Sequence, residues 1–500
     1  MEWLTRRALE GPRATLALVL VVSALAASGL PRIGTEVGYR GVLGDAHPSV
    51  LELEAFISRF GGGLPVFAVY SCAETARCAS VFDELPLQMA HSIEQAMLEH
   101  PLVRRVDSPA SAPILVPAPG GFAVRRMIED GRVAEDREAL RQRALGEELW
   151  EGNLVSRDGR VGAIVLQLAS SDSHTTSTVV PDLRAALAPF EAQGFRFHLV
   201  GDPVDFAVAG GELQRETPRI VPLMIVLIAG IVFTLLRSWR MTGVALLTTG
   251  LSVLWAIGCM GWLGWPQSEL TQALAPAVLV IGVCGAIHVL ARYASLADSA
   301  GGRSPQDLVL RVVGEVGTPS MICAFTTVAG FLSFSTSEFA SFLRFGTVAS
   351  IGVLASLLLS FTLLPVLLVR IPLVRIGGGG HSEAWDRALQ LIVRISDRRG
   401  SAILAVAGGL LLVCVIGLTR LEVDVDEREL FGENNQVVHW AEFVEENLRP
   451  PTRSRSRSQR RKARRSWSRP RWRRSRRSRP CFRPSKASAA CAASSIRSGA

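Results

Sequence analysis

The sequence lacks the short motifs by which most enzymes are identified. It has no Gly-x-Ser-x-Gly elbow to carry a nucleophile, and its His and Cys residues nowhere have the spacing of a metal site. The glycine run at 61–65 is not followed by Lys-Thr, as a phosphate-binding loop requires. We therefore expect no enzymatic activity, no metal and no cofactor.

Acidic residues are absent from the end of the chain. Residues 451–500 hold 18 of the 54 Lys and Arg and none of the 45 Asp and Glu, which leaves 36 basic and 45 acidic residues elsewhere. From the set Val, Ile, Leu, Met and Phe this arginine- and serine-rich tail contains only Phe482 and Ile496, so it is expected to be disordered, and it has the charge to bind nucleic acid. Its abrupt onset is, however, typical of a GC-rich gene read in the wrong frame. We interpret residues 450–500 in that way and expect no nucleic-acid partner.

Apolar residues are abundant in the chain. They make up 48% of the full sequence, and its mean hydropathy is +0.28, as in a membrane protein that also carries a soluble domain. Seven stretches reach the length of about 20 apolar residues that a bilayer-spanning helix needs. They cover approximately 13–31, 218–237, 241–263, 271–292, 319–338, 345–370 and 401–419.

The arginines predict the orientation of these spans. Arg6, Arg7 and Arg13 precede the first span, and Arg237 and Arg240 lie in the turn between the second and third. Since cytoplasmic loops carry an excess of basic residues, we expect a cytoplasmic N-terminus and place 32–217 outside the cell membrane. The first span also resembles a signal peptide, because "ALAASG" offers small residues for cleavage, but we favour an uncleaved anchor.

The segment 32–217 shows the order strand–helix–strand twice. "LPVFAVYS", "LVRRVDSP", "RVGAIVLQLA" and "FRFHLVGDP" are typical of strands, and a helical pattern follows the first and the third. This βαββαβ order predicts a ferredoxin-like α+β module. Cys72 and Cys78 fall within it, and their spacing permits a disulfide or leaves two free thiols.

The segment 371–400 is predicted to be a cytoplasmic linker. It contains "GGGG" at 377–380 and then an amphipathic helix. The span at 401–419 and the polar residues after it repeat the order seen at 1–31, so 420–449 is interpreted as the start of a second outer domain. Parallel repeats of six spans are common in transporters.

Four motifs carry a resemblance to a known family. They are "GNLVSRDGRVGAIVLQL", "PLMIVLIAGIVFTLLRSWR", "VIGVCGAIHVLARY" and the long run 318–368 with its Thr-Thr, Gly-Phe-Leu, Phe-Gly and Leu-Leu-Pro landmarks. With these the chain resembles the resistance–nodulation–division (RND) superfamily, in its MMPL or hydrophobe-exporter branch, over about 1–449. The helices at 218–370 are also similar to a sterol-sensing domain. Family proteins have twelve spans and two porter domains, so this chain matches their N-terminal half.

The resemblance implies an exporter of lipids or other hydrophobic compounds in the bacterial inner membrane, driven by protons. Relatives of this kind place an Asp in the fourth span, where this chain has Cys284 and Gly285. The interiors of the second to sixth predicted spans contain no Asp or Glu. Glu269 and Glu315 lie at the edges of these spans, and Glu338 is the last residue of the fifth. Two alternatives are a lipid-sensing or lipid-binding membrane protein that does not pump, and an inactive half-transporter. Whether the chain forms a homo-oligomer is left open.

His288 is the remaining candidate for a proton relay, because histidine is the side-chain type that ordinarily exchanges protons at physiological pH. It lies one helical turn from Cys284, and Thr326 and Thr327 of the next span are candidate hydrogen-bond partners. The alternatives are an interfacial histidine bonded to a neighbouring carbonyl and a threonine pair that serves helix packing. In the sixth span, small residues recur at a spacing that favours close helix packing, namely Gly346, Ser350, Gly352 and Ser356.

Overall fold

A computed structural model describes residues 1–448, apart from a set of short internal segments. The tail at 450–500 and the glycine run at 377–380 lie outside the described residues. The chain up to residue 450 forms one compact unit. The segments not described within it are 61–63, 73–77, 148, 299–303, 371–382, 422–431 and 433–434.

Among the residues that the structure describes, seven helices are long and apolar enough to cross a membrane, as the sequence predicts. Most begin and end close to the expected limits, but α8 begins sixteen residues before the span predicted at 218, and α11 begins fourteen residues before the span predicted at 319. With 35 residues at about 1.5 Å each, α8 is much longer than the apolar layer of a bilayer is thick. The spans are α2 (Pro12–Ala27), α8 (Asp202–Leu236), α9 (Trp239–Trp262), α10 (Leu274–Asp298), α11 (Pro305–Leu332), α12 (Ala340–Phe361) with α13 (Leu363–Arg370), and α15 (Gly400–Leu418).

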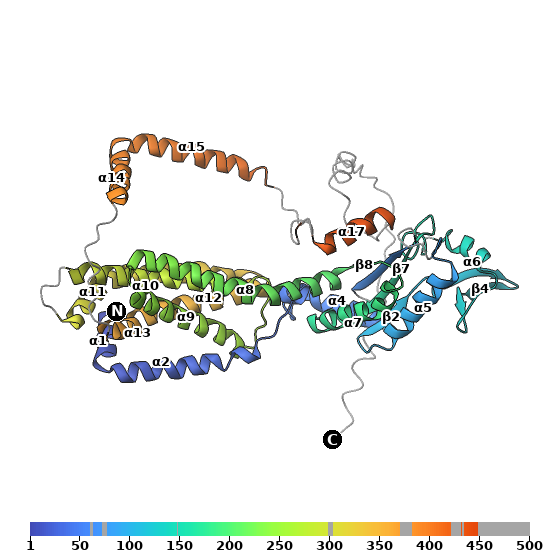
Figure 1. The fold of residues 1–500 in the computed structure, drawn as a ribbon, viewed down its shortest axis with the longest axis horizontal. Helices are drawn as coiled ribbons and strands as arrows, with labels where there is room; N and C mark the ends of the chain where they lie inside the picture. The colour runs from blue at the N-terminus through green and yellow to red at the C-terminus, as the bar shows by residue number, and fades with distance from the viewer. Residues whose placement is uncertain are drawn as a thin grey trace, which may run out of the picture. The chain divides into compact units, whose positions relative to one another are not determined.

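Helices α9, α10 and α12 form the centre of a helical bundle. Helix α2 packs on α9, α8 packs on α10, and α11 packs on both α10 and α12 (Figure 1). The buried side chains between them are mainly Leu, Val and Ala. The amphipathic helix expected before the last span is present as α14 (Glu383–Arg398), whereas α15 buries none of its residues.

A short helix, α1 (Glu2–Glu10), precedes the first span and packs on α11 and α13. Its contact lies at a break in the sixth span, where α12 ends at Phe361. Pro365 has no N–H, so the carbonyl of Phe361 has no partner four residues later in the helix. The hydroxyl of Thr5 donates to this carbonyl at 2.7 Å. Both residues are almost completely buried, at 0% and 1% exposure.

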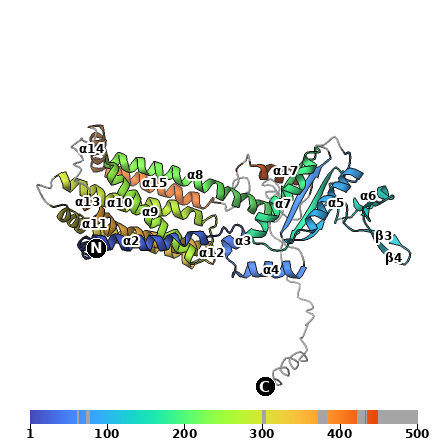
Figure 2. The same cartoon turned by 60° about the horizontal axis from the view of Figure 1, so that its bottom comes forward.

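The chain between α2 and α8 folds around a four-stranded sheet, called here the sheet domain. Its strands are β1 (Pro65–Ser71), β2 (Val103–Asp107), β7 (Val161–Leu168) and β8 (Phe197–Val200), in the order β2-β7-β1-β8 with every neighbouring pair antiparallel. Helices α5 (Glu84–Leu98) and α7 (Ser173–Glu191) contact each other and the sheet (Figure 2). This is the predicted ferredoxin-like arrangement. Three short helices lead from α2 into the sheet, namely η1 (Leu30–Arg32), α3 (Tyr39–Leu43) and α4 (Pro48–Phe60). Two further short helices, η2 (Thr271–Ala273) and η3 (Ser333–Thr336), belong to the bundle.

An insertion between β2 and β7 extends the sheet domain. It contains two hairpins and a helix, and the indole of Trp150 is fully buried at its base, where it donates to the carbonyl of Pro113. The elements are β3 (Ile114–Ala118), β4 (Gly121–Arg125), β5 (Ile128–Glu129), β6 (Arg132–Val133) and α6 (Arg137–Ala144).

The sheet is buried on both faces. Alternate residues of β1, such as Ala68 and Tyr70, belong to the core that includes α5 and α7. The residue between them, Val69, packs instead with Val444 and Leu448, which belong to and directly follow α17 (Gln436–Asn447). The described part of the segment 420–449 thus covers the second face of the first sheet, and Figure 1 shows α17 beside β8.

Candidate functional site

A pocket lies at the end of the bundle next to the sheet domain. Its volume is about 500 Å³, which is within the range of small-molecule sites. Its walls are mostly apolar and come from α8, α9 and the start of α10, with residues such as Val221, Ile257 and Leu274. A few polar groups line the rest, and among them the amide of Gln272 donates to the hydroxyl of Thr217 at 2.9 Å. An apolar ligand with a polar end fits this lining.

Residues 34–38 connect the pocket to the sheet domain. On one side they pair with a pocket residue, since Glu36 N donates to Gln267 O and Gln267 N donates to Gly34 O, each at 2.8 Å. On the other side the hydroxyl of Ser173, at the start of α7, donates to the Glu36 carboxylate at 3.0 Å and accepts from Val37 N at 2.7 Å. Hydrogen bonds through residues 34–38 thus link the start of α7 to the pocket wall.

Burial raises the pKa of Glu36 above its ordinary value, although the hydrogen bonds from Ser173 act in the opposite direction. This carboxylate therefore takes up a proton more readily than an exposed one would.

Tyr39 and Gly38 connect the segment 34–38 and the start of α3 to α8. The Tyr39 hydroxyl donates to the Asp202 carboxylate at 2.6 Å, and its ring lies edge-on to Phe206. Gly38 has φ +85°, and a Cβ there would lie 2.7 Å from the Phe206 ring. Only glycine satisfies both constraints.

The relay candidates are close in sequence but are not joined into one network. His288 and Cys284 both face outward from the bundle on α10, and His288 makes no hydrogen bond within the described part of the chain. The hydroxyls of Thr326 and Thr327 donate to the carbonyl of Cys323 in their own helix, at 2.9 and 2.8 Å. The hydroxyl–histidine bonds considered from the sequence are not present here.

Carboxylates in the described spanning helices lie outside the apolar stretches predicted from the sequence. In α8 the last one is Glu216, just before the stretch 218–237, and in α11 it is Glu315, before the stretch 319–338. Glu315 is engaged by two arginines, with Arg311 at 3.2 Å and Arg292 of α10 on its other oxygen. The middle of the bundle contains serine and threonine hydroxyls instead, including Thr249 and Ser252, which donate to carbonyls of their own helix.

The small residues of α12 lie at close contacts between helices. A Cβ on Gly346 would lie 2.2 Å from the carbonyl oxygen of Phe331, and one on Gly352 would lie 2.7 Å from Val278. Ser350 and Ser356 are buried on the same helix. These positions leave no room for a larger side chain.

A second set of glycines was missed by the sequence analysis. Gly29 lies just after α2 and meets Gly258 and Gly261 of α9, where an added Cβ would come within 2.1–2.2 Å of backbone oxygen. The spacing of three residues between Gly258 and Gly261 was the available signal. This contact places the end of the first span beside the pocket, since Met260, which lies between the two α9 glycines, lines the pocket.

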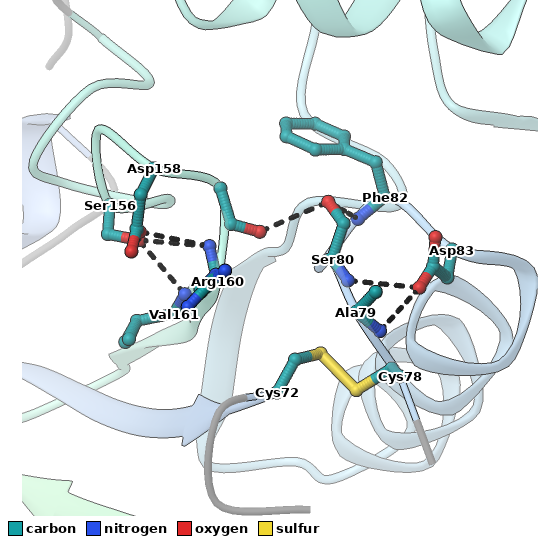
Figure 3. The surroundings of a disulfide bond; sticks show 11 residues. Cys72, Cys78, Ala79, Ser80, Phe82, Asp83, Ser156, Asp158, Arg160 and Val161 are labelled. Carbon is teal, nitrogen blue, oxygen red and sulfur yellow. Dashed lines mark hydrogen bonds between the residues drawn. A yellow bond between two sulfur atoms is a disulfide. The ribbon is translucent and has the colours of Figure 1, made fainter. Parts of the chain in front are cut away.

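Cys72 and Cys78 form a disulfide in the loop that follows β1 (Figure 3). The Asp83 carboxylate accepts from the N–H groups of Ala79 and Ser80, at 2.8 and 2.9 Å. The Ser80 hydroxyl donates to the carbonyl of Gly159 at 3.1 Å. The disulfide thus closes a loop that is also tied to the start of β7, away from the pocket.

Comparison with known proteins gives a family match and two relatives. The model of the MMPL family matches residues 114–397, more than half of the chain. A membrane protein of Methanocaldococcus jannaschii, MJ1562, is 30% identical over 25% of this chain and 31% of its own length. The multidrug resistance protein MdtC of Pectobacterium atrosepticum is 26% identical over 52% of this chain and 24% of its own length. The matched part of the chain thus spans less than a third of either relative. The match confirms the resemblance seen in the sequence: this multi-pass membrane protein belongs to the MMPL family, within the RND superfamily.

Proposed function

We propose that the chain takes part in the export of lipids or other hydrophobic compounds across the bacterial inner membrane. The observation that carries the proposal is the apolar pocket between α8, α9 and α10, with its polar end beside the sheet domain. Family membership and the similarity to a multidrug resistance protein support the same class of function. The N-terminus is cytoplasmic in this proposal, in agreement with the basic residues around the first span.

In this scheme a hydrophobic molecule leaves the outer leaflet and occupies the pocket. Its apolar part lies against Val221 and Ile257, and its polar end lies near Gln272. Residues 34–38 then transmit a movement of the sheet domain to the pocket wall through Ser173. The chain binds and moves its substrate, and catalysis has no part in the scheme.

Filling the pocket tests the proposal. The Val221→Trp substitution places an indole in the pocket and is expected to reduce transport of a fluorescent lipid in proteoliposomes at least tenfold. Val226→Trp is the matched control, because Val226 lies on the same helix with 68% of its surface exposed and outside the pocket. Equal transport by both variants would exclude the pocket as a substrate site.

We further propose that the proton gradient drives this export, with His288 as the relay. The support is that the imidazole of His288 lies within the apolar part of α10, where ionisable residues are costly and commonly functional. His288→Ala should abolish the dependence of transport on the pH gradient while lipid binding remains. Unchanged gradient dependence would remove His288 from the mechanism.

The second candidate function is lipid binding or sensing without pumping. The positions of Glu216 and Glu315 favour it, because both lie outside the predicted apolar stretches of their helices and the hydroxyls in the middle of the bundle do not titrate. Photo-crosslinking of a lipid into the pocket, with no gradient-dependent transport by the same preparation, would support this function over export.

A further inference from the structure

The N-terminal helix α1 has two different faces. Thr5 and Ala8 are buried, and Leu9 packs against the bundle core. The opposite face carries Trp3, which is 68% exposed, together with three arginines. These exposed arginines are Arg6, Arg7 and Arg13, the last just beyond the helix.

The buried face fixes how the helix lies. Thr5 is bonded to the carbonyl of Phe361 at 2.7 Å, which holds the middle of α1 against the break between α12 and α13. Gly11 ends α1, and the hydroxyl of Thr15 donates back to the carbonyls of Ala8 and Gly11, at 3.2 and 3.1 Å. The turn between α1 and α2 is thereby closed, and the outer face of α1 keeps one orientation.

The position of α1 along the membrane normal follows from α2, which begins at Pro12. Because α2 is a membrane-crossing helix, α1 lies where that helix leaves the apolar layer, at the level of the lipid headgroups. Tryptophan and arginine are the residue types enriched at this level. The guanidinium of Arg7 lies 5.6 Å from the centre of the Trp3 ring, so the two side chains form one surface.

The charge of this surface has little compensation. Within the described chain none of the three arginines has an ion-pair partner, while the acidic residues of the helix, Glu2 and Glu10, lie at its two ends. The carboxylate of Glu2 is turned toward α11, 2.7 Å from where a Cβ on Gly314 would be. The arginines therefore present uncompensated positive charge at headgroup level.

We propose that the exposed face of α1 binds the headgroups of anionic phospholipids, with Arg6, Arg7 and Arg13 contacting phosphate and Trp3 inserted beside the glycerol region. This inference does not depend on the chain being an exporter. An arginine near an anionic surface contributes roughly fivefold in affinity. Loss of all three should therefore reduce the preference for anionic lipid at least tenfold, with allowance for the two nearby carboxylates.

Native mass spectrometry of the full-length chain, titrated with phosphatidylglycerol and with phosphatidylcholine, tests the proposal. The wild type is expected to retain phosphatidylglycerol preferentially, and the triple variant R6Q/R7Q/R13Q to lose that preference. The control R59Q/R132Q/R196Q removes the same charge from exposed arginines of the sheet domain and should behave as wild type.

The charge-conserving variant R6K/R7K/R13K should keep most of the preference, and high salt should weaken it in the wild type. Equal retention of the two lipids by the wild type would overturn the proposal, as would an unchanged preference in R6Q/R7Q/R13Q. If that variant does not fold, the salt titration decides: a preference that is insensitive to salt refutes an electrostatic headgroup site.

Discussion

The hydrogen bond between Thr5 and Phe361 is the contact on which the position of α1 depends. In the Thr5→Val variant the side chain keeps its shape but loses its donor, so the carbonyl of Phe361 is left buried and unpaired. An unsatisfied buried acceptor costs about 1–3 kcal/mol. We expect Thr5→Val to lower the free energy of unfolding by that amount in an SDS titration followed by circular dichroism. Thr5→Ser retains the hydroxyl and should cost clearly less.

Pro365 provides a sharper test of the same reasoning. The Pro365→Ala substitution introduces an N–H four residues after Phe361, so the helix can satisfy that carbonyl itself. In this background Thr5→Val should cost much less than in the wild type, with a coupling energy of about 1 kcal/mol or more in a double-mutant cycle. If Thr5→Val costs the same in both backgrounds, the orphaned carbonyl is not what holds α1 in place.

Three further results are expected. Gly346→Ala forces a methyl group against a carbonyl and should destabilise the bundle by about 1–3 kcal/mol, whereas Gly330→Ala, which has open space, should be nearly neutral in the same SDS titration. Replacing Cys72 and Cys78 by serine opens a loop with a sequence separation of 6 and should cost about 2 kcal/mol in the sheet domain by loop-closure entropy; an unchanged thermal midpoint would contradict this. Because the pKa of Glu36 is higher in the folded protein than in the unfolded chain, the segment 34–38 loses stability as the pH rises from the ordinary glutamate pKa through the raised one. Glu36→Gln should flatten this pH dependence of hydrogen exchange at residues 34–38, and an identical profile would count against it.

Much of the fold is predictable because it depends on local patterns. A long run of apolar residues predicts each span, and short apolar segments between helical ones predict β1 and β7. The start of α8 was not predictable in this way. Its first turns are mixed in polarity, and they become helical because they continue a membrane helix and pack against α7.

The pocket and its connection to the sheet domain were not predicted, since they depend on contacts between distant segments. The sequence drew attention to His288 because a titratable group is rare in an apolar run. Nothing local indicates that Gln267 pairs with Gly34 and Glu36, or that Ser173 bonds to Glu36. The burial of the sheet on both faces could have been predicted from β1, because its sequence is almost continuously apolar and such strands are commonly buried on both faces.

The packing of α17 on the sheet has a consequence for biosynthesis. The last strand ends at Val200, but the helix that covers its second face begins at Gln436, about 240 residues later. At a synthesis rate of ~5–20 residues per second, that face stays uncovered for roughly ten to fifty seconds. Throughout that interval five membrane-crossing helices between β8 and α15, and then α15 itself, must be inserted before α17 reaches the sheet. Until the chain returns, the side chains of Val69, Val161 and Ala163 on this face of the nascent sheet lack the cover that Val444 and Leu448 provide in the folded protein.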